Sequence, residues 1–190
     1  MTNAPDADED AALACRAAGG DRTAFNGLVR RYQEPLYRFI RRYVGDADEA
    51  YDLLQESFVA AWQAIKRLDP DRPAIVWLRR IALNKCRDWG RRRTVRQFFY
   101  GAARLETASI ADSSEDHTGE DAALGRLDAA IARLPPQLKE PLLLTTFEGM
   151  SQEQAGAALG LTAKAVETRL YRARKLLADM LKAPGSDTDA

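Results

Sequence analysis

The chain has 190 residues, with 28 lysines and arginines against 28 aspartates and glutamates, so its formal net charge is zero. That zero combines two opposed blocks, because residues 65–100 hold eleven basic and three acidic residues whereas residues 101–128 hold two basic and seven acidic ones. A neutral total therefore does not exclude a nucleic-acid partner. Two distant cysteines without a CxxC motif, and no apolar run near the ~20 residues that span a bilayer, exclude a disulfide scaffold and a membrane-spanning protein.

The N-terminal segment is acidic and lacks an apolar core. We expect residues 1–9 to be disordered, and to be neither a secretory nor a membrane segment. With no signal peptide and no redox motif, a reduced, cytoplasmic setting is indicated. A short helix is predicted over residues 10–18, and Gly19 and Gly20 are expected to end it.

Two amphipathic helices follow. The first is predicted from an N-cap at Thr23 to Gly45, and Pro35 inside it is expected to kink or split it. Asp46 starts the second, which precedes a loop with two prolines and two aspartates at residues 68–73. The apolar face of this second helix consists of Leu54, Phe58, Ala61, Trp62 and Ile65.

Acidic and amide side chains of the same helix mostly face away from that apolar stripe. They are Asp48, Asp52, Gln55 and Glu56. Charges on a helix are usually just solvated. The alternative is a docking face whose groups pair with basic residues of a partner protein, and the residue pattern alone favours neither.

A further helix is predicted from about residue 75 to residue 93 or beyond. Arg80, Asn84, Arg87 and Arg91 recur on one face, which gives a stripe of three guanidinium groups and one amide. A positive stripe suits a phosphate backbone, and an amide, which both donates and accepts, suits a base edge. The loop at residues 68–73 is expected to accept an extruded base of a single strand.

The alternative for this helix is purely structural. Trp77 and Trp89 would then belong to the core, Asn84 would cap a local backbone group, and the arginines would be solvated. For the tryptophans alone this alternative is favoured. For the arginines nucleic-acid binding is favoured, because a solvated face does not readily explain so many cations within residues 65–100.

The domain organisation follows from composition. Residues 10–100 form a predicted first domain, and residues 101–122, which are polar and acidic, a flexible linker. The second domain covers residues 123–182, with its first helix broken by Pro135 and Pro136, and residues 183–190 are expected to be a frayed tail. Because no strand signal occurs, the fold class is all-α, with two small helical domains on a flexible acidic linker.

The second domain contains a helix-turn-helix pattern at residues 151–175. Ser151 and Gln154 have the spacing of a capping box, Gly160 is placed to end the first helix in a left-handed conformation, and Thr162 is the predicted N-cap of the second. Small and apolar residues share one face of the first helix: Ala155, Ala158 and Leu159.

The second helix of this pattern has two distinct faces. A predicted buried stripe consists of Val166, Leu170, Ala173 and Leu177. The other side is an exposed face of donors with one aromatic ring: Lys164, Thr168, Tyr171, Arg172 and Lys175. This division is typical of a DNA-recognition helix, and the alternative is an ordinary helical hairpin with solvated charges.

Four stretches in this order and spacing carry a family resemblance: residues 25–62, 77–93, 134–161 and 166–177. With them the chain resembles bacterial RNA polymerase sigma factors, specifically the small extracytoplasmic-function (ECF) group of the sigma-70 family. The resemblance implies two helical domains, regions 2 and 4. It also implies a factor that lends promoter recognition to core polymerase, takes part in a stress response and is held by an anti-sigma factor.

The resemblance also implies roles for individual residues. Those expected to dock on the β′ clamp helices of polymerase are Asp52, Leu54, Gln55 and Glu56. Those expected at the single-stranded −10 element, where the loop Leu68–Pro73 captures a flipped base beside Asn84, are Asp69, Arg72, Trp77, Arg80, Asn84, Arg87 and Arg91. Those expected in the −35 major groove are Lys164, Glu167, Thr168, Arg169, Tyr171, Arg172 and Lys175. Region 4 is also expected to meet the β flap.

Three departures from the family pattern limit what can be transferred. Glu167 stands where the family usually has Lys or Arg, and an acid there is expected to repel phosphate or to bind a cytosine amino group. Pro141 replaces an aliphatic residue, so the helix around it is expected to start late or kink. The loop at residues 68–73 lacks the usual aromatic pattern, which leaves the −10 preference open, just as Glu167 leaves the −35 sequence open.

No catalytic constellation is present, so the protein is not expected to be an enzyme or to need a cofactor or metal. His117, the single histidine, lies in an acidic stretch without partner ligands. Two other functions compete with that of a promoter-specificity subunit: a stand-alone transcriptional regulator, and an RNA-binding or polymerase-inhibiting adaptor. The polymerase-docking residues and the Asn84 stripe favour the first function, because a simple repressor would not require them.

Overall fold

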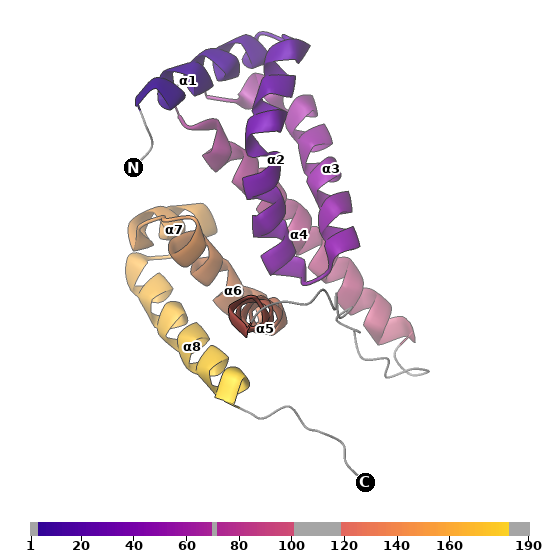
Figure 1. Cartoon of the computed structure of the whole chain (residues 1–190), viewed down its shortest axis with the longest axis vertical. Helices are drawn as coiled ribbons and strands as arrows, with labels where there is room; N and C mark the ends of the chain where they lie inside the picture. The colour runs from indigo at the N-terminus through magenta and orange to yellow at the C-terminus, as the bar shows by residue number, and fades with distance from the viewer. Residues whose placement is uncertain (1–3, 70–71, 101–118, 183–190) are drawn as a thin grey trace. The chain divides into compact units, whose positions relative to one another are not determined.

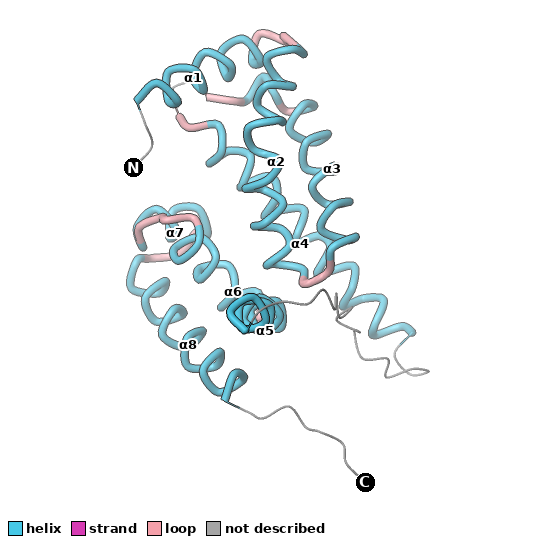
Figure 2. The backbone as a smooth tube through the Cα atoms, viewed as in Figure 1, coloured by secondary structure: helices cyan, strands magenta, loops and turns pink. Residues whose placement is uncertain are grey.

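The computed structural model describes residues 4–69, 72–100 and 119–182, and within these ranges every regular element is helical. The elements are α1 (Ala4–Ala18), α2 (Arg22–Val44), α3 (Ala47–Gln63), the 3₁₀ turn η1 (Ile65–Arg67), α4 (Ala74–Tyr100), α5 (Gly119–Arg133), α6 (Pro136–Leu142), the π-helix η2 (Leu143–Phe147), α7 (Gln152–Leu159) and α8 (Ala163–Lys182). Figures 1 and 2 show these helices and the short loops between them.

The helices form two compact units. The first contains α1, α2 up to Arg41, α3, η1 and α4, and the second contains Arg42–Asp46 and α5 to α8. The prediction of an all-α protein with two small helical domains is confirmed. Residues 101–118 of the predicted linker and the predicted tail, residues 183–190, lie outside the described residues.

Helix α1 begins earlier than predicted. The expectation that residues 1–9 are disordered is wrong for residues 4–9, which are helical. Ala14 and Ala17 are fully buried, and α1 contacts η1 and α4. Alanine side chains are small, so they form only a weak apolar stripe in the sequence. The acidic composition of the segment therefore led to a prediction of disorder.

Helix α2 is capped by Asp21 and not, as predicted, by Thr23. The Oδ1 atom of Asp21 accepts hydrogen bonds from the N–H groups of Thr23 at 2.8 Å and Ala24 at 3.1 Å, two donors that have no partner inside the helix. The hydrogen bond from Ala24, followed by that from the Arg16 guanidinium, holds the pKa of Asp21 below its ordinary value of 3.8.

Pro35 lies inside α2 without splitting it. A proline in a helix interior costs about 3 kcal/mol, because it removes a hydrogen bond and crowds the preceding turn. Each large apolar side chain that is buried contributes about 1.5–3 kcal/mol in the opposite direction. Packing therefore outweighs the proline, since buried residues flank it on both sides: Leu28, Leu36, Phe39 and Ile40.

Helices α3 and α4 pack against each other in the first unit. The ring of Phe25 in α2 contacts those of Phe58 and Trp62 in α3, with centroid distances of 6.5 Å and 5.2 Å. Trp89 of α4 is buried, and its Nε1–H donates to Glu49 Oε2 of α3 at 2.8 Å. The structural interpretation of Trp89 is thereby confirmed, whereas Trp77 is only half-buried.

In the second unit α5 begins at Gly119, so residues 119–122 are helical and the linker predicted there is too long. Helix α6 begins at Pro136, directly after Pro135, as the proline pair predicts. Pro141 does not delay the helix but lies near its end, and a π-helix follows, in which the Glu148 N–H donates to the Leu143 carbonyl at 3.2 Å.

The predicted helix-turn-helix has the expected capping geometry. The Gln154 N–H donates to Ser151 Oγ and the Ser151 N–H to Gln154 Oε1, which completes the capping box. Gly160 ends α7 with φ of 69°, a left-handed conformation. Thr162 Oγ1 accepts from the Ala165 N–H at 3.2 Å at the start of α8.

Candidate nucleic-acid interface

Helix α8 separates a buried stripe from an exposed polar face. All four residues of the predicted stripe, Val166, Leu170, Ala173 and Leu177, are buried where α5, α6 and α7 pack on α8. On the opposite side Lys164, Thr168, Tyr171, Arg172 and Lys175 are all exposed. Tyr171 is 70% exposed, which is unusual for so large an aromatic side chain. An exposed ring among cations suits contact with nucleic acid.

The polar face of α8 has its own internal pairing. Lys164 Nζ lies 2.8 Å from Glu167 Oε2, and Thr168 Oγ1 donates to the Lys164 carbonyl at 2.9 Å. The Glu167 departure is thus compensated locally by a neighbouring cation. Within the described part of the chain, Arg172 forms no ion pair, and Arg169, also expected in the groove, is half-buried.

Gly156 sets the turn that positions α8, and the sequence analysis did not single it out. It is buried in α7, and a Cβ atom placed there would lie 2.6 Å from the Leu161 carbonyl oxygen. The Leu161 N–H donates to the Gly156 carbonyl at 2.8 Å, so the two backbones are in direct contact. The signal that could have found it is a glycine within a small-residue helix, where close packing is the usual reason to tolerate its helix penalty.

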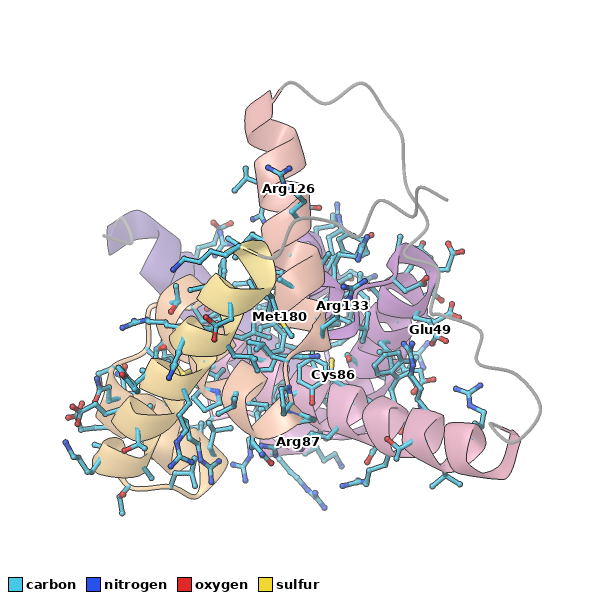
Figure 3. All side chains as sticks on the ribbon, turned by 90° about the horizontal axis from the view of Figure 1, so that it is seen from below. Glu49, Cys86, Arg87, Arg126, Arg133 and Met180 are labelled. Atoms are coloured by element: carbon cyan, nitrogen blue, oxygen red, sulfur yellow. The ribbon has the colours of Figure 1, made fainter. Side chains whose placement is uncertain are left out.

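The stripe on α4 is only partly exposed. Arg80, Asn84 and Arg91 are exposed, and Arg91 pairs with Asp88. Arg87 is half-buried and already has an interaction partner. Figure 3 labels Arg87 on α4, and Glu49 on α3, the acceptor of the Trp89 hydrogen bond. The concentration of cations on this helix therefore serves packing as well as an accessible surface.

Val76 extends the exposed part of this stripe and was missed. It lies one turn before Arg80 on the same helix face and is 45% exposed. An apolar side chain next to a guanidinium and an amide offers a surface on which a base can lie. The signal was the i, i+4, i+8 spacing of Val76, Arg80 and Asn84.

The loop before α4 is described only at its two ends. The Arg72 N–H donates to the Asp69 carbonyl at 3.2 Å, and Arg72 Nε lies 3.2 Å from Asp69 Oδ2, so the two predicted site residues bind each other. Both are exposed. Residues 70 and 71 lie outside the described residues. Asn84 lies about 15 Å along α4 from Ala74, at a rise of ~1.5 Å per residue.

Helix α3 exposes a mixed acidic and apolar face. Asp52 and Gln55 are exposed as a docking surface requires. Leu54 is only 8% exposed and belongs to the core. Glu56 is half-buried, and its Oε2 atom lies 3.3 Å from Lys85 Nζ of α4. Of the four residues expected to dock, two are therefore exposed to a partner, whereas the other two take part in packing within the unit.

Two exposed apolar residues complete the α3 face. Tyr51 is 57% and Val59 58% exposed, and with Gln55 they occupy one line at i, i+4 and i+8. Large apolar side chains beside carboxylates are typical of a protein-binding surface. The signal in the sequence is the i, i+4, i+8 spacing of Tyr51, Gln55 and Val59 on the face away from the buried stripe.

Within the described residues no helix is long and apolar enough to cross a membrane. Among the same residues no group of three or more His, Cys, Asp or Glu side chains is placed to hold a metal ion.

Comparisons with known proteins agree with this arrangement. The family models Sigma-70 region 2 and Sigma-70, region 4 match residues 28–96 and 124–177. The RNA polymerase sigma factor CnrH of Cupriavidus metallidurans is 40% identical over 183 residues, which cover 93% of this chain and 96% of that protein. The ECF RNA polymerase sigma factor SigE of Mycolicibacterium smegmatis is 32% identical over 192 residues, 95% of this chain and 72% of that protein.

A solved structure of CnrH in complex with the cytosolic domain of CnrY is also similar. It superposes with a TM-score of 0.67 at 35% sequence identity, and covers 92% of this chain and 98% of that chain. The likeness extends over both helical units.

Proposed function

The chain belongs to the sigma-70 family, in its ECF group, and from this premise we propose how its helix faces divide the work of promoter recognition. Sigma factors start transcription without catalysis of their own, so the prediction that the chain is not an enzyme is confirmed. The first unit is proposed to serve as region 2, and the second as region 4.

One observation carries this proposal: the exposed donor face of α8 lies opposite a fully buried stripe. A helix with such faces, held by a helix-turn-helix, can enter a major groove without disturbing its own packing. Arg172 is proposed to bind a base edge of the −35 element, with Thr168 and Tyr171 beside it. Lys164 and Lys175 are proposed to contact phosphates, and Glu167 to accept from a cytosine amino group.

The exposed part of α4 is proposed to bind the non-template strand of the −10 element. Val76 supplies an apolar contact, Arg80 a phosphate contact, and Asn84 a base contact. Because Asn84 lies about 15 Å along the helix from Ala74, we place the loop residues Asp69 and Arg72 on one nucleotide and Asn84 on another. Three further residues are proposed to border this strand-binding surface: Trp77, Arg87 and Arg91.

The α3 face is proposed as the polymerase-docking surface for the β′ clamp helices. Tyr51 and Val59 supply apolar contact, and Asp52 and Gln55 supply charge and hydrogen bonds. Glu56 and Leu54 are proposed to hold α3 in place, Glu56 through its pairing with Lys85 and Leu54 through its place in the core. The second unit is proposed to meet the β flap.

Regulation by an anti-sigma factor is proposed to use the docking surface of α3. Support comes from CnrH, which was solved with the cytosolic domain of CnrY bound. Such a partner would keep the factor from polymerase until a stress signal releases it. Because core polymerase acts in the cytoplasm, we propose the same location for this chain.

Transcription in vitro with purified core polymerase and a randomised promoter library tests the whole proposal. We expect transcripts only when this chain is added, and enrichment of two sequence elements at −35 and −10. Binding of promoter DNA by the chain alone would indicate a stand-alone regulator instead. Binding of core without any initiation would indicate an inhibiting adaptor.

Docking is tested separately with Asp52→Ala and the matched variant Glu34→Ala, which removes an exposed carboxylate on α2. We expect Asp52→Ala to weaken the affinity for core several-fold, while Glu34→Ala leaves it unchanged. Equal affinities for the two variants would show that α3 is not the docking surface.

A further inference from the structure

A carboxylate is buried in the first unit at a position that the proposed function does not use. Asp10 of α1 is only 6% exposed. It precedes residue 28, where the region 2 family model begins to match. A buried charge is costly unless other groups compensate it, so the groups around Asp10 indicate what it does.

Three groups surround this carboxylate. Asp10 Oδ2 accepts a hydrogen bond from the Ala74 N–H at 3.4 Å. Asp10 Oδ1 lies 3.7 Å from Arg31 Nη1, an ion-pair distance that is too long for a hydrogen bond. The Tyr32 hydroxyl interacts with the same carboxylate, and burial together with that carboxylate raises the pKa of Tyr32 above its ordinary value of 10.0.

Ala74 is the first residue of α4, where helix N–H groups lack internal partners. The residue before it is Pro73, whose side chain offers no acceptor, so the helix has no cap of its own at that position. The carboxylate of Asp10 supplies the missing acceptor from 64 residues away, at the end of the helix dipole that favours a negative charge.

Helix α1 also contacts both elements that bracket the loop at residues 68–73. It packs on η1, which ends at Arg67, and on α4, which begins at Ala74. Helix α1 therefore contacts the elements on both sides of the loop.

We propose that Asp10 is a positioning residue for capture of the −10 strand, because it fixes the start of α4 and with it Arg72 and Val76 on either side of that start. The inference rests on the proposed role of α4 and the loop in binding that strand. Asp10 itself does not touch DNA. It sets where Asp69, Arg72 and Val76 lie relative to one another.

The test uses holoenzyme assembled from purified core and the full chain. The probes are a fluorescent non-template oligonucleotide, carrying the −10 sequence that the promoter library selects, and a version abasic at the captured position. The variants are Asp10→Ala, Asp10→Asn and the matched control Glu9→Ala. Glu9 is exposed and pairs with the same Arg31.

We expect Asp10→Ala to weaken binding of the intact strand about five- to tenfold, the usual scale of a lost helix cap, and to change binding of the abasic strand less than about twofold. Asp10→Asn keeps an acceptor oxygen and is expected to lose about two- to threefold. Glu9→Ala is expected to match the wild type, and all variants are expected to bind core equally.

A local cap offers a second measurement. Pro73→Ser places a hydroxyl at the N-cap of α4, where it can accept from the N–H of Ile75 or Val76 and so fix the start of the helix by a different bond. In the Asp10→Ala or Asp10→Asn background this substitution is expected to restore the preference for the intact over the abasic strand. If Asp10→Ala does not fold, the inference is tested by comparing Asp10→Asn with the double variant that also carries Pro73→Ser.

If Asp10→Ala kept the wild-type preference for the intact over the abasic strand, the inference would be overturned while the proposed function stands. The same would follow if Glu9→Ala lost as much affinity for the intact strand as Asp10→Ala. A wild-type holoenzyme that neither initiates nor prefers the intact strand would overturn the proposed function, and the inference with it.

Discussion

Helices α8 and α4 both carry cations on one face, yet they present them differently. On α8 the predicted buried positions are buried and the donors opposite them are exposed. On α4 the predicted stripe mixes exposed Arg80, Asn84 and Arg91 with half-buried Arg87. A basic face is therefore a good predictor of an accessible surface only where the packing is confined to the other side.

The physical cause lies in the neighbours of α4. Its polar residues take part in packing: Trp89 donates to Glu49, and Lys85 pairs with Glu56, both across the contact with α3. Helix α8 instead uses mainly apolar residues for packing and leaves Lys164, Arg172 and Lys175 exposed, although Arg169 is half-buried. We expect substitutions on α8 to separate cleanly into folding and binding effects, and those on α4 to mix them.

The largest effect is expected from Gly156→Ala, which alters the support of α8. The added Cβ would lie 2.6 Å from the Leu161 carbonyl oxygen, which is backbone and must move. We expect a loss of about 3 kcal/mol in the free energy of unfolding, the upper range for overpacking, and loss of −35 recognition. Denaturant unfolding followed by circular dichroism measures it.

The matched control is Gly125→Ala in α5. A Cβ there meets nothing within 4 Å, so the substitution is expected to stabilise the protein by about 0.5–1 kcal/mol. Destabilisation of similar size in both variants would show that the contact with Leu161 is not the cause.

Arg172→Ala probes binding without folding. We expect it to weaken −35-dependent initiation by about 1–3 kcal/mol, the scale of one base-contacting side chain, with an unchanged thermal midpoint. Run-off transcription on intact and −35-scrambled templates measures it, and Arg174→Ala, exposed on the flank of α8, is the control. Equal initiation from both templates by wild type and variant would refute the role.

Asn84→Ala probes the corresponding function of α4. We expect core binding to be kept and strand opening to fall by about 1 kcal/mol, because one hydrogen-bonding group is lost. Permanganate reactivity of thymines at the −10 element measures opening, with Asn26→Ala, exposed on α2, as the control. Unchanged reactivity in Asn84→Ala would exclude base capture by this residue.

The smallest effect concerns the cap of α2. Because folding lowers the pKa of Asp21 from 3.8, the ionised carboxylate stabilises the folded state above that pH. This contribution is lost as the pH falls below 3.8 and through the folded-state pKa. We expect the difference in thermal midpoint between wild type and Asp21→Asn to be present at neutral pH and to vanish in acid. A difference that persists unchanged in acid would contradict the assignment.

The sequence predicts what short-range chemistry determines. The capping box at Ser151, the left-handed Gly160 and the Thr162 cap all depend on residues within one turn, and all three are present. The buried stripe of α8 follows from helical periodicity alone. The order of the four family stretches was sufficient to predict both units.

The sequence does not show contacts that a distant residue supplies. Glu56 pairs with Lys85 of α4, and the N–H of Ala74 at the start of α4 donates to Asp10. Leu54 was expected at an interface because it lies in a family motif, yet it is buried, as its place on the predicted apolar face of the helix indicates. Pairings such as those of Glu56 and Asp10 arise only when the helices pack, so no pattern within one segment shows them.

The pairing of Lys164 with Glu167 has a consequence for how such factors diverge. Both side chains are exposed on the outer edge of α8 and support no part of the core. Replacement of Glu167 by lysine or glutamine would change the charge offered to the groove at almost no cost to the scaffold. The promoter preference of such a factor can thus change by single substitutions at this edge, while the stability of the fold stays the same.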